Sequence, residues 1–192
     1  GCSGGATLRD GRVCIRRSPN GGKSGRGLFS GPKGLGPTDF ILYSGEVISA
    51  DEANARRARG MTNYILQLSY RADGDRIDGR MFVNAIRSKP DADGLYWPSQ
   101  NWAYDAGPGC LANEDNLTPN AKFEMRYIEK NRDFGLHRVI VPLRRIEPGE
   151  EIRPKYGSKT PREDERACAH KQREPHSYSS DGKRKRHLSP HD

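Results

Sequence analysis

Residues 149–157 read Gly-Glu-Glu-Ile-Arg-Pro-Lys-Tyr-Gly and end the part of the chain whose composition suits a folded domain. The Pro-Gly pair at 148–149 is a turn signal at the start of this stretch. After Gly157, the sequence changes to Ser, Lys, Arg, Glu, Asp and His with hardly an aliphatic residue, a composition that cannot form a hydrophobic core. We therefore predict one folded domain over residues 1–157 and a basic, disordered tail over residues 158–192.

The composition of the whole chain limits the fold and the partners. A length of 192 residues suits one domain plus an appendage, and only 33% of the residues are hydrophobic while Gly (22) and Pro (13) are abundant. We therefore expect many turns and no long helices. The net charge of +8 favours acidic partners such as nucleic acid or chromatin, although ordinary solvation explains it equally well. No apolar run approaches the roughly 18 residues of a membrane span, and we predict no membrane contact.

The cysteines and histidines argue against a metal centre. No two of the cysteines have the close spacing of a zinc or redox pair; they are Cys2, Cys14, Cys110 and Cys168. Sparse cysteine without a secretory signal favours a reducing compartment, and disulfides remain an alternative. His137 is the only histidine outside the tail, so the predicted domain has too few histidines to favour histidine-based catalysis. We predict no metal site.

Short runs of aliphatic and aromatic residues predict a mainly β fold. We expect strands at residues 13–15, 40–43, 45–48 as a continuation of 40–43, 64–68, 76–78, 121–127 and 136–143. Ser49 with Glu52 forms a capping box, which predicts a brief helix through residues 51–57. A second short helix is expected near residues 81–86, inside a long loop.

Further motifs precede the closing stretch. Lys23-Ser24-Gly25-Arg26-Gly27-Leu28-Phe29 contains two close glycines, which let backbone approach a ligand and donate amide hydrogen bonds to it. A glycine-rich turn alone is more often structural, and the phosphate-binding form is excluded because no helix opens here. Tyr43-Ser44-Gly45-Glu46 follows, the pair Ile77-Asp78 ends a predicted hairpin, and Asn113 precedes Pro119-Asn120. The information lies in the order of these motifs.

In this order, and with the closing stretch 149–157, the motifs resemble those of SET-domain protein-lysine methyltransferases. The family pattern runs from Gly-x-Gly and Tyr-x-Gly-Glu through a hydrophobic-Asp pair and Asn-His-Ser-Cys-x-Pro-Asn to Gly-Glu-Glu-Leu, followed by a tyrosine. The resemblance covers roughly residues 12–157. It implies a fold of small curved β-sheets with a C-terminal pseudoknot and few short helices, and S-adenosylmethionine as the cofactor.

The resemblance also implies roles for individual residues. Tyr156 matches the family's tyrosine beside the methyl-transfer channel and is the expected catalytic residue. Glu46 and Glu151 are expected to be architectural. The residues expected to hold the amino-acid, ribose and adenine parts of the cofactor are Lys23, Gly25, Arg26, Gly27, Asn113 and Glu114.

The chain departs from the family pattern at several positions. Glu114 replaces the family's His, Cys110 stands where an Arg is usual, and Pro154 stands where many members have an aromatic residue that governs how many methyl groups are added. The family's zinc-binding cysteines are absent, so we expect another segment, such as part of residues 158–175, to close the lysine channel. Asp75 stands where a channel tyrosine is common and is interpreted as a hairpin-turn residue.

The chemistry of methyl transfer fits these residue types. Transfer to an amine is an in-line displacement, so positioning and exclusion of water do most of the work. A lysine amine with a pKa near 10.4 must first lose its proton, which costs about 4.6 kcal/mol at pH 7 in water and less in a dry channel. The Tyr156 hydroxyl can orient the amine and place partial negative charge near the sulfonium methyl without itself being the base.

We therefore expect transfer of methyl groups from S-adenosylmethionine to a lysine of a protein, with a histone as the first guess. Two alternatives stay open: a catalytically weak SET fold that binds peptides or chromatin, and a basic nucleic-acid binder. The run Lys183-Arg184-Lys185-Arg186 predicts nuclear localisation or contact of the tail with a polyanion. A cytoplasmic location and a merely solvated tail remain alternatives.

Overall fold

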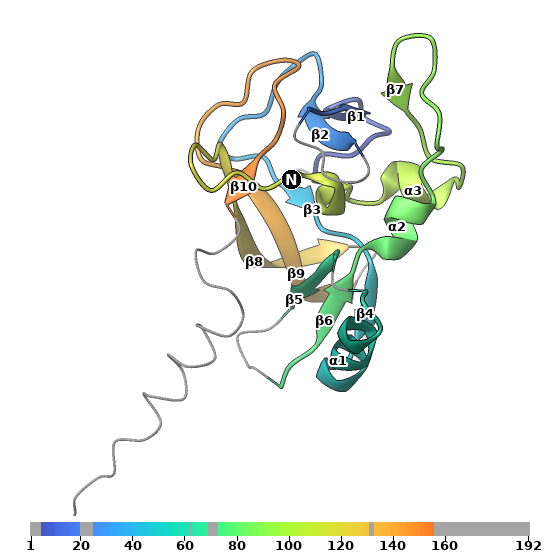
Figure 1. Cartoon of the computed structure of the whole chain (residues 1–192). Helices are drawn as coiled ribbons and strands as arrows, with labels where there is room; N and C mark the ends of the chain where they lie inside the picture. Colours follow the sequence, from blue (N-terminus) through green and yellow to red (C-terminus); the bar gives the residue numbers. More distant parts are fainter. Residues whose placement is uncertain (1–4, 20–24, 62, 69–72, 131–132, 156–192) are drawn as a thin grey trace, which may run out of the picture. The chain divides into compact units, whose positions relative to one another are not determined.

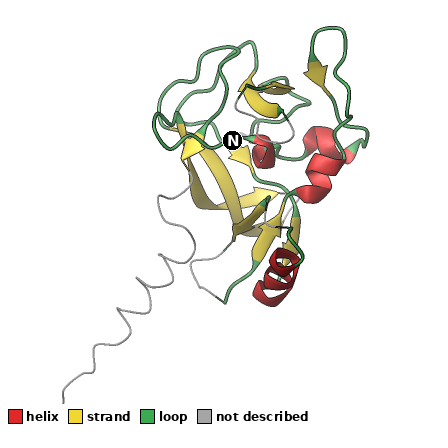
Figure 2. Cartoon of the chain, viewed as in Figure 1, coloured by secondary structure: helices red, strands yellow, loops and turns green. Residues whose placement is uncertain are grey.

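A computed structural model of the chain describes residues 5–19, 25–61, 63–68, 73–130 and 133–155. This part is mainly β-structure in three small sheets, with a few short helices beside them (Figures 1 and 2). The predicted fold class is therefore confirmed. The tail expected over residues 158–192 lies outside the described residues.

The first sheet contains β1 (Val13–Arg17), β2 (Arg26–Ser30) and β7 (Leu95–Tyr96) in the order β2-β1-β7. β1 is antiparallel to both neighbours, and Ile15 lies opposite Leu28. Both of these side chains are buried in the main hydrophobic core, because alternate residues of a strand face the same side of a sheet. The strand predicted at residues 13–15 is confirmed and is two residues longer.

Residues before β1 also belong to the domain. Ala6 and Leu8 are buried in the main core. The Ala6 N–H donates to the Phe40 carbonyl at 2.7 Å, and the Arg9 N–H donates to the Tyr104 carbonyl at 3.0 Å. The N-terminal segment therefore contacts two distant parts of the fold, although the sequence motifs begin only after it.

The second sheet contains β3 (Ile41–Leu42), β8 (Ala121–Lys130), β9 (Asp133–Pro142) and β10 (Pro154–Lys155), in the order β10-β8-β9-β3. β8 and β9 pair along their whole length as an antiparallel hairpin, which confirms the predicted pair of strands and makes them longer than predicted. β10 pairs with β8 in parallel. The last described strand therefore returns to the start of β8, on the side away from β9.

The third sheet contains β4 (Glu46–Ile48), β5 (Ile65–Gln67) and β6 (Arg76–Asp78), with β6 in the middle. The antiparallel pairing of β5 with β6 confirms the predicted hairpin. The prediction that residues 45–48 continue the strand at 40–43 is wrong, because β3 and β4 belong to different sheets. The chain changes sheet at Gly45, where a Cβ atom would overlap the Asp78 carbonyl and lie 2.9 Å from the Gly79 nitrogen.

In the described part, α1 (Ala50–Ala58) joins two strands of the third sheet, and two further short helices and a 3-10 turn lie between the third sheet and β8. The two helices are α2 (Arg80–Asn84) and α3 (Trp102–Asp105), and the turn is η2 (Gly109–Leu111). The Ser49 hydroxyl accepts from the Glu52 N–H at 3.2 Å at the start of α1, so the predicted cap is confirmed. α2 lies at the predicted second helix, whereas α3 and η2 lie in a region where the sequence predicts a loop.

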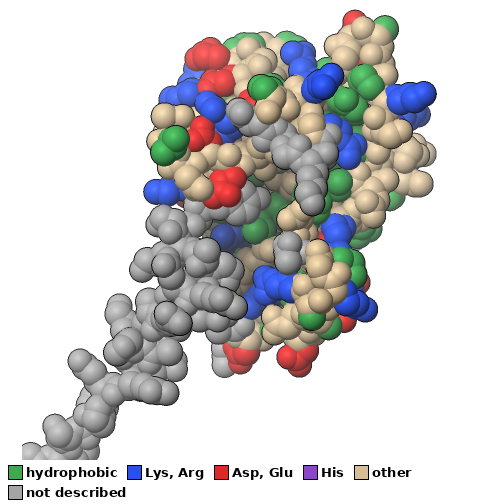
Figure 3. Space-filling view, in the orientation of Figure 1, with side chains coloured by type: hydrophobic (Ala, Val, Ile, Leu, Met, Phe, Trp, Pro, Cys, Tyr) green, Lys and Arg blue, Asp and Glu red, His purple; other side chains and the backbone are tan. Residues whose placement is uncertain are grey.

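The surface of the described part mixes charges of both signs. On the face shown in Figure 3, Lys and Arg side chains are interspersed with Asp and Glu. None of the helices in the described part is long and apolar enough to cross a membrane.

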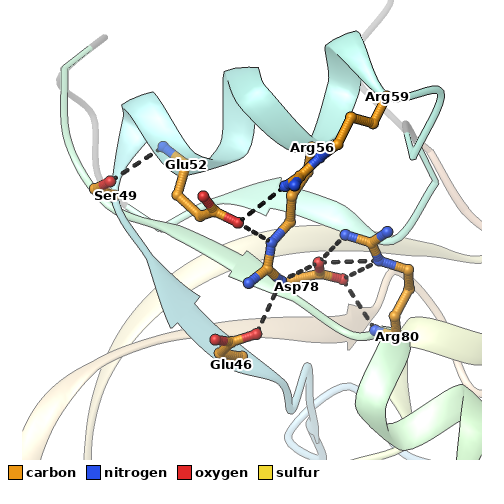
Figure 4. Close-up of polar contacts among 7 residues, drawn as sticks. All are labelled: Glu46, Ser49, Glu52, Arg56, Arg59, Asp78 and Arg80. Atoms are coloured by element: carbon orange, nitrogen blue, oxygen red, sulfur yellow. Dashed lines mark hydrogen bonds and ion pairs between the residues drawn. The ribbon is translucent and has the colours of Figure 1, made fainter.

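An ion-pair network around the buried Asp78 attaches α1 to the third sheet (Figure 4). Asp78, at the end of β6, has a side chain only 1% exposed and accepts hydrogen bonds from Arg56 at 2.8 Å and from the Arg80 guanidinium. Arg56 also donates to Glu52 at 2.7 Å and to Glu46 at 2.8 Å. Burial alone would raise the pKa of Asp78, but the hydrogen bonds from Arg80 and Arg56 outweigh it and lower the pKa.

Replacing Asp78 by Asn should destabilise the domain by about 3 kcal/mol at neutral pH, because Arg80 loses the anion that it pairs with and Arg56 loses the buried one of its three carboxylate partners. The folded-state pKa of Asp78 lies below its ordinary value, so its contribution is complete above about pH 4 and is lost as the pH falls through the folded pKa. Urea unfolding of wild type and Asp78→Asn between pH 7 and pH 3 measures the difference, which should shrink in acid. Asp93→Asn, at an exposed loop position, is the control; equal stability of Asp78→Asn and wild type at pH 7 would contradict the role of the network.

Candidate functional site

The two glycines of the Gly-x-Gly motif have different structural roles. Gly25 has a φ of 61°, a left-handed conformation that favours glycine, and a Cβ atom there would meet no atom of the described residues within 4 Å. Gly27 is buried in β2, and a Cβ atom there would overlap a carboxylate oxygen of Glu151 and lie 2.7 Å from the Asn113 amide nitrogen. Gly25 thus leaves open space, while Gly27 makes room for two polar side chains.

The side chain of Asn113 connects β2 to the closing stretch. Its amide nitrogen donates to the Arg26 carbonyl at 3.1 Å and to Glu151 Oε1 at 2.7 Å. Because both partners are acceptors, the amide group has one orientation only, with the nitrogen towards them. Within the described residues, the carbonyl oxygen of this amide makes no hydrogen bond.

The closing stretch lies between two segments that are far away in the sequence (Figure 1). On one side the Ile152 N–H donates to the Leu28 carbonyl at 2.8 Å. On the other side the Asn120 N–H donates to the Arg153 carbonyl at 3.1 Å, and the Asp115 N–H donates to the Pro154 carbonyl at 3.2 Å. This crossing is the C-terminal pseudoknot that the motif order implied.

Asn120 holds this crossing with its side chain. It is fully buried, its amide nitrogen donates to Glu150 at 3.0 Å and to the Glu151 carbonyl at 2.7 Å, and its oxygen accepts from the Arg153 N–H at 2.8 Å. Hydrogen bonding from Arg144, with a further hydrogen bond from Asn120, lowers the pKa of Glu150 to about 2 against the effect of burial. The sequence pointed to Asn120 only as part of a motif; its structural role becomes visible in these contacts.

The loop after Asn113 is held by Asp115. Its carboxylate accepts from the backbone N–H groups of Thr118 and Leu117, which lower its pKa, and pairs with Arg153 at 2.7 Å. The side chain of Glu114 is exposed. A ligand would therefore contact Glu114 either through its backbone or through its side chain at the surface.

The structure brings together part of the set of residues predicted for the cofactor. Arg26 O, Gly27 and the Asn113 side chain are in contact, with Gly25 and Glu114 adjacent to them in the chain. The Arg26 side chain extends to β7 instead, where its guanidinium lies 5.7 Å from the Tyr96 ring centroid. The predicted residues outside the described part are Lys23 and Tyr156, the latter directly following β10 in the chain. All of these ligand and catalytic roles remain predictions.

The departures from the family pattern have structural counterparts. Cys110 is buried, burial raises the pKa of its thiol, and a Cβ atom at Gly79 would lie 2.5 Å from its Cβ, so it serves as a small apolar side chain. Pro154 lies in β10, opposite Ala121. Asp75 is exposed beside β6. Among the described residues, no three His, Cys, Asp or Glu side chains form a group that could hold a metal ion.

Comparison with known proteins gives matches among solved structures only. No protein-family model and no curated protein matches the chain. Apo ctPRC2 with mutations in Ezh2 matches 86% of the chain with 22% identity and a TM-score of 0.52. Chaetomium thermophilum Polycomb Repressive Complex 2 bound to GSK126 matches 87% with 20% identity and a TM-score of 0.52. ctPRC2 bound to S-adenosylmethionine in an autoinhibited conformation matches 83% with 19% identity and a TM-score of 0.51.

These matches identify the fold. This chain spans only 16 to 18% of the length of the matching chains, so the likeness concerns one domain of much larger proteins. The domain described here has the SET fold that the order of the sequence motifs predicted.

Asn120→Ala should lower the free energy of unfolding by about 3 kcal/mol, because the substitution removes three hydrogen bonds and leaves buried partners without them. Chemical denaturation followed by circular dichroism measures the loss. Asn116→Ala removes the same side chain from an exposed position of the neighbouring loop and should change stability by less than about 0.5 kcal/mol. If the two variants were equally stable, the crossing would not depend on the Asn120 side chain.

Proposed function

We propose that this chain binds S-adenosylmethionine and transfers its methyl group to a lysine side chain of a protein. The observation that carries the proposal is the meeting of Gly27, Asn113 and Glu151 on a SET fold, in the segment that leads directly to Tyr156. These positions come from three motifs separated by large parts of the sequence. Their contact at one point of the fold supports a shared task.

The residues at this point fit the proposed cofactor. Open space at Gly25 admits a ligand next to the backbone of β2. The Arg26 carbonyl, the Asn113 amide oxygen and the Glu151 carboxylate are all acceptors, and such a set suits the α-ammonium group at the amino-acid end of S-adenosylmethionine. One of the similar structures is described as bound to S-adenosylmethionine, which is a further reason to test this compound first.

In this proposal the cofactor supplies a methyl group on a positively charged sulfur, which is an electrophile for in-line displacement. The chain has to hold the substrate amine in line with that methyl and to exclude water. Tyr156 has the remaining task of orienting the amine through its hydroxyl. The Asn120 contacts fix the segment from Glu150 to Arg153, and so determine where the chain enters this part of the site.

A histone is the first substrate to test. One of the similar structures is described as a complex with H3K27me3, and the basic run Lys183-Arg184-Lys185-Arg186 suits a nuclear protein that meets chromatin. The second candidate is a catalytically weak SET fold that binds peptides or chromatin. It is favoured by Cys110, Glu114 and Pro154, which depart from the family's motifs.

Cofactor binding and methyl transfer separate the two candidates. The full chain should take up S-adenosylmethionine in a calorimetric titration and transfer radiolabelled methyl to histones or to proteins of a cell lysate. If it binds the cofactor without transferring methyl to any protein, the binding-module interpretation is favoured. If it does neither, the enzyme proposal is wrong.

Tyr156→Phe should lower the rate of methyl transfer by about 100-fold or more while leaving cofactor affinity unchanged, because only the orienting hydroxyl is removed. Initial rates at saturating cofactor and peptide measure the effect. Tyr104→Phe is the matched control: it removes a hydroxyl that makes only a 3.4 Å hydrogen bond to the Pro98 carbonyl, and should keep full activity. Full activity of Tyr156→Phe would remove Tyr156 from the mechanism without affecting the fold.

A further inference from the structure

Glu151 is a half-buried carboxylate that pairs with no cation among the residues that the structure describes. Of the described residues with known side-chain exposure, the other carboxylates that are at least partly buried all have an Arg or Lys partner within 4 Å; they are Asp39, Glu52, Asp78, Asp115, Glu124 and Glu150. Glu151 makes no ion pair with any described residue and accepts one hydrogen bond, from the neutral amide of Asn113 at 2.7 Å. Removing a charge from water without a partner costs free energy, so the partial burial of the Glu151 carboxylate needs an explanation.

The acceptors around Glu151 match one kind of ligand group. The Asn113 amide nitrogen lies 3.1 Å from the Arg26 carbonyl and 2.7 Å from Glu151 Oε1, so the two acceptors are close together. The carbonyl oxygen of the same amide is a third acceptor. A primary ammonium group has three N–H donors, one for each of these three acceptor groups, and its single positive charge balances the single negative charge of Glu151.

The substrate lysine is not the source of this cation, since its amine must be neutral to react. We infer that Glu151 is the counter-ion of the α-ammonium group of the bound cofactor, and that it determines specificity for a ligand with that group. The inference rests on the proposed function. Gly27 is part of it, because any side chain at that position would occupy the space of the carboxylate.

The competing interpretation is that Glu151 only orients Asn113. Glu151→Gln separates the two, because a glutamine oxygen still accepts the hydrogen bond from Asn113 but carries no charge. If Glu151 has only an architectural role, the Glu151→Gln variant should keep the ligand affinities of wild type. If Glu151 is the counter-ion, the variant should lose affinity only for ligands that carry the ammonium group.

The experiment compares two stable ligands by calorimetric titration of the full chain. One is S-adenosylhomocysteine, and the other is its deamino analogue, which differs only in having hydrogen in place of the α-amino group. Wild type should bind S-adenosylhomocysteine about tenfold more tightly or better, since a hydrogen bond between charged groups is stronger than a neutral one. Glu151→Gln should lose most of this preference by weakening S-adenosylhomocysteine, with the affinity for the analogue unchanged within about twofold.

Glu150→Gln is the matched control. The adjacent carboxylate already pairs with Arg144 at 2.5 Å, so neutralising it should leave the preference for the ammonium ligand intact. Thermal unfolding of each free variant shows whether the fold is kept.

The outcomes distinguish this inference from the proposed function. If wild type binds both ligands equally, or if Glu151→Gln keeps the wild-type preference, Glu151 is not the counter-ion and the proposed function is unaffected. The first of these tests uses wild type alone and holds even if Glu151→Gln does not fold. If wild type binds neither S-adenosylmethionine nor S-adenosylhomocysteine, the proposed function fails and the inference fails with it.

Discussion

The buried amide of Asn120 is the interaction on which this domain depends. It directly precedes β8 and binds the closing stretch through three hydrogen bonds. A buried amide is tolerated when its donors and its acceptor are used, so the position of the stretch is determined closely. That position places Glu151 against Asn113, and Gly27 leaves room for both. Fold and candidate site are therefore held by the same few contacts.

The features that the sequence predicted well are those encoded by neighbouring residues. The capping box at Ser49 needs only residues one helical turn apart, and the hairpin of β8 and β9 needs two apolar runs and a turn. The order of the motifs predicted the SET fold as a whole, because each motif is short and its place in the chain is informative. The first residues of the domain carry no such motif, and their packing was found only in the structure.

The features that the sequence did not give depend on distant partners. At the change of sheet, Gly45 lies against the backbone of Asp78, a contact that no local pattern predicts. The same is true of the candidate site. Glu151 was expected to be architectural, whereas its contact with Asn113 and its lack of an ion pair with any described residue are seen only in the structure.

The position of the closing stretch between β2 and the Asp115–Asn120 segment has a consequence for the order of assembly. Its hydrogen bond from Ile152 to the Leu28 carbonyl joins residues separated by most of the domain, and a contact of such separation carries a large entropy cost and forms slowly. The site needs the same stretch in place, because Asn113 and Glu151 meet only when the closing stretch lies beside β2. A ligand that binds there binds only the finished domain, so folding and occupancy are linked, and about 100 Kd of free ligand would stabilise the crossing by about 2.7 kcal/mol.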